Sequence, residues 1–357
     1  MTVVAREFDI LETGVNQRLR PGALQMSRTI LMGDPQFFSV RGGANPHTRN
    51  VLGLKKRVRA ERARHQWHSL AYALIQRGAE VIVVEPHELL PGLVYPANAG
   101  FLFPLEGVST DQKVFYLANL LPTRAPEREV YRRVIESIGF VTGNLVARFE
   151  GEADFFPAGS YMIFTYGNVE RQRFVPRAGL PPWRRVYGFR SERGALPELQ
   201  RIAASRPILP LELSDEAYYH GDTVLCSFGP RREYLLAYMD GLTQESRLRL
   251  RGAFGPDLIE LDSVDAARYA ANSFQIISEG RCGLILPSGL SLGTLAQIRD
   301  RGVEPISVDV SEFLAKGGGS IKCMILDLGP TSELPADPGS TSFRARRNYS
   351  AMFQPGY

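Results

Sequence analysis

Short apolar runs alternate with longer stretches in which apolar residues recur at helical spacing. Runs such as Val81-Ile82-Val83-Val84 are apolar without interruption, which is typical of strands buried on both faces of a sheet. The predicted strands cover residues 29–32, 81–84, 145–149, 162–164, 223–228, 233–238, 283–286 and 322–328. The predicted helices cover residues 56–78, 126–138, 195–204, 264–274 and 291–301. The pattern therefore predicts an α/β protein.

Two segments lack this alternation. Residues 171–193 are rich in Arg, Pro and aromatic residues, and they are predicted to form an extended loop. After Gly329 the composition shifts to Pro, Ser, Asp and Arg, and a loosely held tail is expected there. No Gly-x-Gly-x-x-Gly turn and no Walker-type loop joins a strand to a helix, which disfavours a doubly wound nucleotide-binding sheet.

The composition excludes several classes of protein. With 357 residues and 44% hydrophobic content, the chain can bury the core of one large domain or two medium ones. The formal net charge is only +4, and the densest basic run, residues 55–64, continues into a helical pattern. A solvated helix face explains this run better than a nucleic-acid interface, which needs aromatic or motif context.

Cysteine usage and the absence of targeting segments bear on the compartment. Cys226, Cys282 and Cys323 have no paired spacing, so neither a disulfide framework nor a zinc site is expected. The N-terminus lacks an apolar core long enough for a signal peptide, and no stretch has the length of a transmembrane helix. A cytoplasmic protein without membrane association is expected.

Cys323 is the first candidate for chemistry. It follows Lys316-Gly317-Gly318-Gly319-Ser320-Ile321-Lys322 and precedes an apolar run that is predicted to be a buried strand. The glycines allow chain or ligand to approach closely, and Lys322 is placed to lower the pKa of the thiol. The alternative is an inert, buried cysteine at the start of a strand.

Two polar clusters lie upstream. In Tyr219-His220-Gly221-Asp222, an extended backbone would place His220 and Asp222 on one face, as a general acid/base and an anchor for a cation. In Glu150-Gly151-Glu152-Ala153-Asp154, three carboxylates lie between apolar residues, which suits a guanidinium or another cation. A metal site is less favoured, because no metal-loop spacing is present. A structural turn remains open for each cluster.

The order of these motifs resembles the guanidino-group-modifying superfamily, which comprises arginine deiminases, dimethylargininases, arginine dihydrolases and amidinotransferases. Its members carry an acidic motif ending in Asp, then His-x-Asp, then a Gly-rich turn into a C-terminal cysteine. Three further segments are similar to family elements: 32–38 with Asn45-Pro46-His47, 94–100 and 188–191. Gly221, Glu152-Ala153 and Lys322 depart from the commoner family residues.

The resemblance implies a fold and a domain organisation that periodicity alone does not give. It implies a five-module α/β-propeller of ββαβ units with pseudo-fivefold symmetry, and the site at its central channel. The domain would span residues 28–329, between an N-terminal extension at 1–27 and a C-terminal tail at 330–357.

The resemblance also implies roles for individual residues. Cys323 would attack the guanidinium carbon, and His220 would protonate the leaving nitrogen and then activate the second nucleophile. Asp154 is expected to complete the catalytic set and, with Asp222, to hold the guanidinium. The other expected substrate-binding residues are Asn98, Arg190 and Glu152. Neither a metal nor another cofactor is implied.

A hydrolase acting on arginine or a substituted arginine is the favoured activity. An amidinotransferase that passes the amidino group to an amine remains an alternative, and so does a non-catalytic binder of a cationic ligand. A papain-like hydrolase is disfavoured, because those enzymes place Cys early and His late. The expected partner is a small guanidino compound; no nucleic acid or membrane partner is expected, and homo-oligomerisation stays open.

Overall fold

The computed structural model describes residues 27–40, 45–50, 54–170, 173–177, 180–331 and 345–346. Apart from Ser27, the predicted N-terminal extension lies outside these residues, as does nearly all of the predicted C-terminal tail. The domain boundaries at 28 and 329 therefore stay a prediction.

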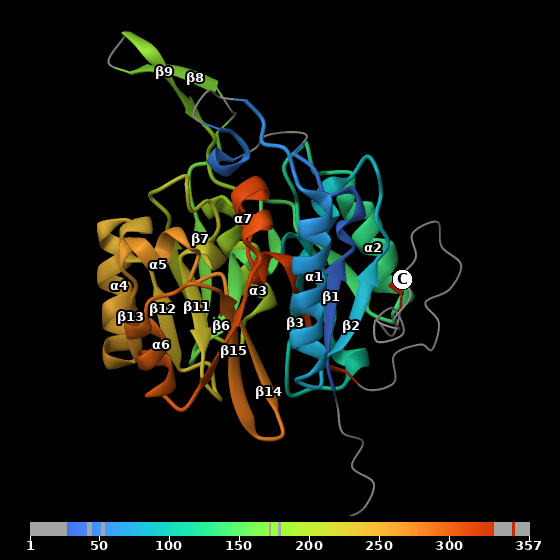
Figure 1. Cartoon of the computed structure of the whole chain (residues 1–357). Helices are drawn as coiled ribbons and strands as arrows, with labels where there is room; N and C mark the ends of the chain where they lie inside the picture. The colour runs from blue at the N-terminus through green and yellow to red at the C-terminus, as the bar shows by residue number, and fades with distance from the viewer. Residues whose placement is uncertain are drawn as a thin grey trace, which may run out of the picture.

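Five sheets carry most of the strands, and Figure 1 shows them side by side with helices on the outside. The strands are β1 (Ser27–Gly33), β2 (Glu80–Val84), β3 (Gly100–Phe103), β4 (Val114–Leu117), β5 (Val141–Asn144), β6 (Phe155–Ala158), β7 (Tyr161–Tyr166), β10 (Ile208–Glu212), β11 (Leu225–Phe228), β12 (Tyr234–Ala237), β13 (Leu258–Glu260), β14 (Phe274–Ser278), β15 (Arg281–Pro287), β16 (Glu304–Val308), β17 (Leu326–Thr331) and β18 (Ala345–Arg346). The α-helices are α1 (Ala60–Ile75), α2 (Glu127–Ser137), α3 (Leu196–Ile202), α4 (Gln244–Phe254), α5 (Ser263–Ala267), α6 (Leu292–Arg299) and α7 (Ser311–Gly317).

Each of the five sheets repeats one order of elements. An antiparallel pair is followed by a helix and then by a third strand parallel to the second, as in β3, β4, α2 and β5. The other sets are β6-β7-α3-β10, β11-β12-α4-β13, β14-β15-α6-β16 and β17-β1-α1-β2. The last set joins the two ends of the domain, because Ser27 pairs with Thr331.

The turns that precede the first strand of each sheet gather at one place. Four are 3-10 turns: η4 (Pro96–Asn98), η6 (Gly151–Ala153), η8 (Gly221–Thr223) and η11 (Lys322–Met324). Turn η4 contacts both η6 and η11, and η6 contacts η8. The fifth turn holds Asn272, whose backbone oxygen accepts the Lys322 N–H at 3.2 Å. Residues far apart in the sequence are thereby brought together.

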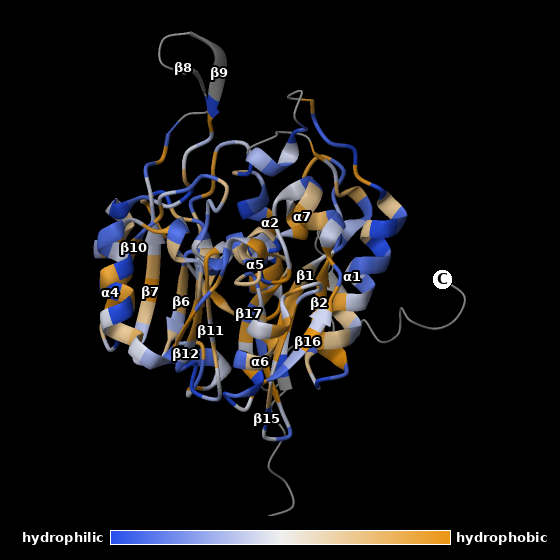
Figure 2. Cartoon of the chain, turned by 60° about the vertical axis from the view of Figure 1, so that its left-hand side comes forward, coloured by the Kyte–Doolittle hydropathy of each residue, from blue (hydrophilic) through white to orange (hydrophobic). Residues whose placement is uncertain are grey.

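The helices cover the sheets through narrow apolar stripes. In α1, Ala63, Trp67, Leu70 and Leu74 are buried at helical spacing, while Arg62 and Arg64 are exposed. The part of the basic run at 60–64 is therefore a solvated helix face, whereas residues 55–59 precede the helix. Figure 2 shows the same division, with apolar strands inside and polar residues on α1 and α4. No helix in the described ranges is both long enough and apolar enough to span a membrane.

Several predicted elements differ from the structure. Residues predicted as a loop at 171–193 include a hairpin, β8 (Arg173–Arg177) and β9 (Leu180–Val186), which projects from the body in Figure 1. No strand forms at 145–149, where Phe149 makes only a bridge to Asn119. The predicted helix 264–274 ends as α5 at Ala267, because β14 starts at Phe274. The predicted strand 322–328 begins with η11 instead.

Candidate active site

The glycine run before Cys323 is required by the packing of the chain itself. A Cβ on Gly317 would lie 2.0 Å from the Tyr95 hydroxyl, and one on Gly319 would lie 2.5 Å from the Tyr95 ring. Gly318 caps α7 in the left-handed region, with φ +76°. The three glycines therefore let the chain pass closely over Tyr95 and set Cys323 on η11.

The Cys323 thiol is buried and has two side-chain partners. Its Sγ accepts the Asn272 Nδ2–H at 3.2 Å and donates to Asp222 Oδ2 at 3.4 Å. Burial and the Asp222 carboxylate raise the pKa of Cys323 well above its ordinary value, although N–H groups of Ser320 and Asn272 act in the opposite direction. The unliganded site therefore holds a thiol. A bound cation would favour the thiolate.

Lys322 does not face this thiol. Its Nζ pairs with Glu152 Oε1 at 2.6 Å and also donates to the Ile325 carbonyl. The expectation that Lys322 acts on the Cys323 pKa is therefore not supported by the contacts of its side chain.

His220 is held by a carboxylate from a different sheet. Its Nε2 lies 2.9 Å from Glu150 Oε2, and both side chains are buried. Burial disfavours the imidazolium, but the charges of Asp154, Glu150 and Asp222 outweigh it and raise the pKa of His220. Burial also opposes ionisation of Glu150, yet the hydrogen bond and charge of His220, with the charges of Arg124 and Arg190, lower the pKa of Glu150 to about 2. The pair is suited to exchange a proton with a bound ligand.

Asp154 does not line the cavity at Cys323. Its carboxylate accepts the hydroxyls of Thr165 and Ser191, both at 2.6 Å, and the Gly221 N–H at 2.8 Å. The sequence pattern predicted Asp154 in the catalytic set and gave Glu150 no role there. In the structure, Glu150 rather than Asp154 contacts His220. Asp154 instead accepts the Gly221 N–H and so holds the turn that follows His220.

Asp222 reaches the sulfur from that same turn. The prediction of an extended segment at 220–222 is wrong, because His220 is followed by the 3-10 turn η8. Burial raises the pKa of Asp222 to about 6, against the charges of His220 and Lys322. One carboxylate oxygen, Oδ1, is buried without a hydrogen-bond partner in the structure. A cationic ligand beside Cys323 would supply donors to it.

The cavity at Cys323 has a volume of about 180 Å³. Asn98 lines it, with Nδ2 3.5 Å from His220 Nε2 and Oδ1 accepting from Arg124 at 2.7 Å. Arg190 lines it too and stacks its guanidinium 4.9 Å from the centre of the Tyr219 ring. Two of the four predicted substrate-binding residues, Asn98 and Arg190, thus share a cavity with Cys323 and His220.

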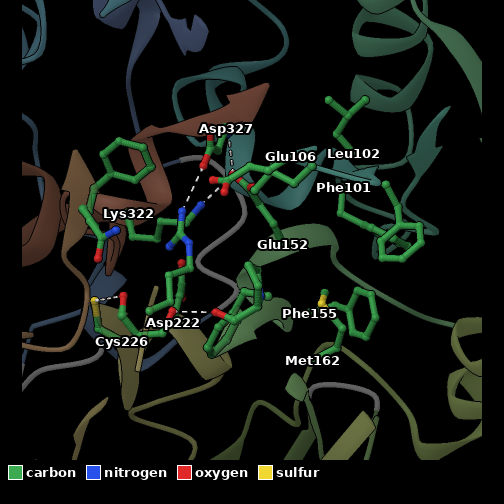
Figure 3. Close-up of a pocket in the computed structure, with 18 of the residues that line it drawn as sticks. Phe101, Leu102, Glu106, Glu152, Phe155, Met162, Asp222, Cys226, Lys322 and Asp327 are labelled. Carbon is green, nitrogen blue, oxygen red and sulfur yellow. Dashed lines mark hydrogen bonds and ion pairs between the residues drawn. The ribbon is translucent and has the colours of Figure 1, made fainter. Parts of the chain in front are cut away.

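Glu152 faces a second cavity, of about 280 Å³, which Figure 3 shows. In this view Glu152 lies beside Lys322 and Asp327, and Asp222 lies at the wall. Glu152 also accepts the Asp327 N–H at 2.9 Å. The expected contact of Glu152 with substrate in the Cys323 cavity is therefore not supported.

Two site residues escaped the sequence reasoning. Glu150 was noticed but ranked below Asp154, and the signal that would have favoured it is its position before the turn, equivalent to His220 before η8. Asn272 was not noticed at all. Ala271-Asn272 repeats the Ala97-Asn98 pair of another module, also two residues before a strand. In the described part of the chain, no cluster of His, Cys, Asp and Glu could hold a metal ion.

Comparison with known proteins places the chain in a family. A family profile described as eukaryotic N,N-dimethylarginine dimethylhydrolase matches residues 189–329. An N(G),N(G)-dimethylarginine dimethylaminohydrolase from Mycobacterium tuberculosis is 30% identical over 307 residues, 85% of this chain and 87% of that protein. The chain belongs to the dimethylarginine dimethylaminohydrolase family. That family lies within the guanidino-group-modifying superfamily, as the motif order predicted, and its chemistry is cysteine-dependent hydrolysis of a guanidino group.

Other members of the superfamily are also similar. A bifunctional arginine dihydrolase/ornithine cyclodeaminase from Nostoc is 26% identical over 83% of this chain, which matches 37% of that protein. The N-terminal domain of a cyanobacterial arginine dihydrolase, ArgZ, shares the fold with a TM-score of 0.70 and 23% identity, over 85% of this chain and 99% of that domain.

Proposed function

We propose that this member of the family hydrolyses the guanidino group of arginine or an N-substituted arginine through a thiouronium on Cys323. The observation that carries the proposal is the contact of the Cys323 thiol with Asp222, next to a cavity that Cys323 lines together with the Glu150–His220 pair. A nucleophile from η11 meets a general acid/base and an anionic anchor that both come from the turn at η8.

The proposed reaction begins with a guanidinium at Asp222. The cation pairs with the carboxylate, the Cys323 thiol releases its proton to solvent, and the resulting thiolate adds to the guanidinium carbon. His220 protonates the departing nitrogen, since an amine leaves as a neutral molecule. Water then adds to the thiouronium carbon while His220 takes its proton. Cleavage of the C–S bond returns the thiolate and releases a ureido product.

We assign the third position of the catalytic set to Glu150 instead of Asp154. An ionised Glu150 at 2.9 Å keeps the His220 ring in place and supports its protonated form. Arg190 is proposed to pair with the carboxylate of the amino-acid substrate, because it is a cation on the wall of the cavity.

A second candidate, an arginine dihydrolase, is favoured by Asn98. Its side-chain amide lies between Arg124 and His220, where it can contact the ureido group after the first hydrolysis. A dihydrolase would carry out a second hydrolysis there and release ornithine.

The finer features of the fold and location are also proposals. The repeated ββαβ order and the pairing of β1 with β17 support a ring closed as a five-module propeller around the five turns. The three free cysteines support the expected cytoplasmic location. Homo-oligomerisation stays a prediction.

The test is to incubate the protein with arginine, N-methylated arginines and an ornithine-like acceptor, and to identify products by mass spectrometry. Ammonia or a methylamine with citrulline supports the first proposal, and ornithine supports the second. A new guanidino compound formed only with the acceptor would instead indicate an amidinotransferase. Cys323→Ser serves as the control, and an absence of turnover with every guanidino compound would contradict both proposals.

A further inference from the structure

Asn272 lies at the centre of the contacts that hold Cys323. Its side chain is fully buried on the turn between α5 and β14, in the sheet that supplies no other residue of the proposed catalytic set. Its backbone oxygen accepts the Lys322 N–H, and its side chain contacts both neighbouring modules. No substrate atom needs to touch it for it to affect the sulfur.

The hydrogen bonds of the amide fix which end faces the sulfur. Oδ1 accepts two backbone N–H groups, from Ser320 at 3.1 Å and from Cys323 at 3.2 Å. Nδ2 donates to the Asp222 carbonyl at 2.9 Å and to Cys323 Sγ at 3.2 Å. A flipped amide would set N–H against N–H and oxygen against oxygen, so only one orientation satisfies all four contacts.

We propose that Asn272 is a positioning residue that holds the Cys323 turn through Oδ1 and stabilises the thiolate through Nδ2–H. The inference rests on the proposed role of Cys323 as nucleophile. A neutral donor suits this role, because it gives the sulfur a hydrogen bond without adding a charge near the substrate cation. Asp222 has the opposite effect until a cation neutralises it. The Asn272 contact needs no ligand.

The other ionisable groups around the sulfur come from several elements. Asp222 and His220 belong to the turn at η8, and Glu150, Arg124 and Arg190 share the cavity wall. Three tyrosines near the sulfur have their pKa values raised by burial, so they stay neutral below pH 10: Tyr95, Tyr219 and Tyr269. A substitution at Asn272 removes none of these ionisable side chains, although it also removes the hydrogen bond to the Asp222 carbonyl.

The test is the alkylation rate of Cys323 by iodoacetamide across pH 7 to 10, followed by peptide mass spectrometry. Below the thiol pKa the rate follows the thiolate fraction, so each unit of pKa change alters it by about tenfold. A hydrogen bond to a charged group corresponds to about a ten- to hundredfold change. We expect Asn272→Ala to alkylate that much more slowly at each pH. No substrate is used, so the result is independent of whether arginine is the substrate.

Two further variants make the test specific. Asn272→Asp keeps an oxygen for the two backbone N–H groups and replaces the donor with a second, charged oxygen, so the lost hydrogen bond and the added charge should both act to slow alkylation, by at least tenfold. Ser273→Ala is the matched control, because it removes a buried hydrogen bond to the Ala270 carbonyl on the same turn without touching Cys323. Its alkylation rate should equal that of the wild type. Wild-type rates in both Asn272 variants, or an equal loss in Ser273→Ala, would overturn the proposal.

Discussion

Glu150 and Glu152 lie two positions apart, and both carboxylates are buried, yet they serve different cavities. Glu150 pairs with His220 at 2.9 Å in the cavity that contains Cys323. Glu152 pairs with Lys322 at 2.6 Å and lines the cavity of Figure 3. Glu150 precedes the turn η6 and Glu152 lies within it, so the two side chains reach different cavities.

The two carboxylates also differ in ionisation, although they are buried to a similar degree. Burial acts against both, but His220, Arg124 and Arg190 lower the pKa of Glu150 to about 2. For Glu152, burial and the nearby Asp327 outweigh Lys322 and raise the pKa to about 7. The set of neighbours, rather than the depth of burial, therefore decides which carboxylate is an anion beside His220.

Replacing each glutamate by glutamine should give the largest difference between the two positions. Glu150→Gln removes the charge that supports His220 and should lower kcat by about 10²–10⁴-fold, the range of a general acid–base contribution. Glu152→Gln should lower kcat by less than about tenfold, because Glu152 faces the other cavity. Steady-state kinetics with the substrate found by product analysis measures both. Similar losses in the two variants would contradict the assignment of separate roles.

The two aspartates allow a second comparison of the same kind. Asp222→Asn removes the anion beside Cys323 and should weaken binding of an arginine-like ligand by about ten- to a hundredfold. Asp154→Asn breaks contacts below the site, so it should mainly lower stability, by about 1–3 kcal/mol. Calorimetric titration and urea unfolding of both variants separate the effects. If Asp154→Asn weakened the ligand as much as Asp222→Asn did, Asp154 would belong in the binding site after all.

The sequence predicted the chemistry of the site better than its geometry. Order and type of residue were enough to predict that Cys323, His220 and Asp222 lie close together, while their roles stay proposals. They could not distinguish three acidic residues within five positions, because a 3-10 turn sends successive side chains in directions that a linear motif does not reveal. Asn272 escaped because a neutral amide has no chemical signature until its four hydrogen bonds are seen.

The fold shows the same limit. Strong apolar runs such as β2 were predicted closely, as was α2. Helix α4 was missed because only Ser246, Leu250 and Phe254 are buried among arginine and glutamate, which leaves little hydrophobic periodicity. The pairing of β1 with β17 depends on contacts between the ends of the domain. Such long-range pairing leaves no local pattern.

The smallest expected effect is on the pH dependence of the free energy of unfolding. The pKa of Glu152 is higher in the folded protein than in the unfolded chain, so the protonated carboxyl stabilises the fold. This stabilisation is lost as the pH rises from about 4.5 to about 7, because the carboxyl then ionises. Glu152→Gln cannot ionise and should lack this loss. Urea unfolding at pH 5 and pH 8 should show the variant gaining on the wild type at the higher pH. A constant difference between the two pH values would contradict the raised pKa.

The central claim is that Cys323 carries the covalent intermediate, and rapid acid quenching tests it directly. After mixing with arginine or an N-methylated arginine, the protein should carry an adduct equal to the substrate minus the departing amine. Peptide mass spectrometry should locate it on Cys323, and His220→Ala, which slows attack by water, should keep it longer. Cys323→Ser should show neither adduct nor turnover. Turnover that persists in Cys323→Ser, or an adduct on another residue, would contradict the account.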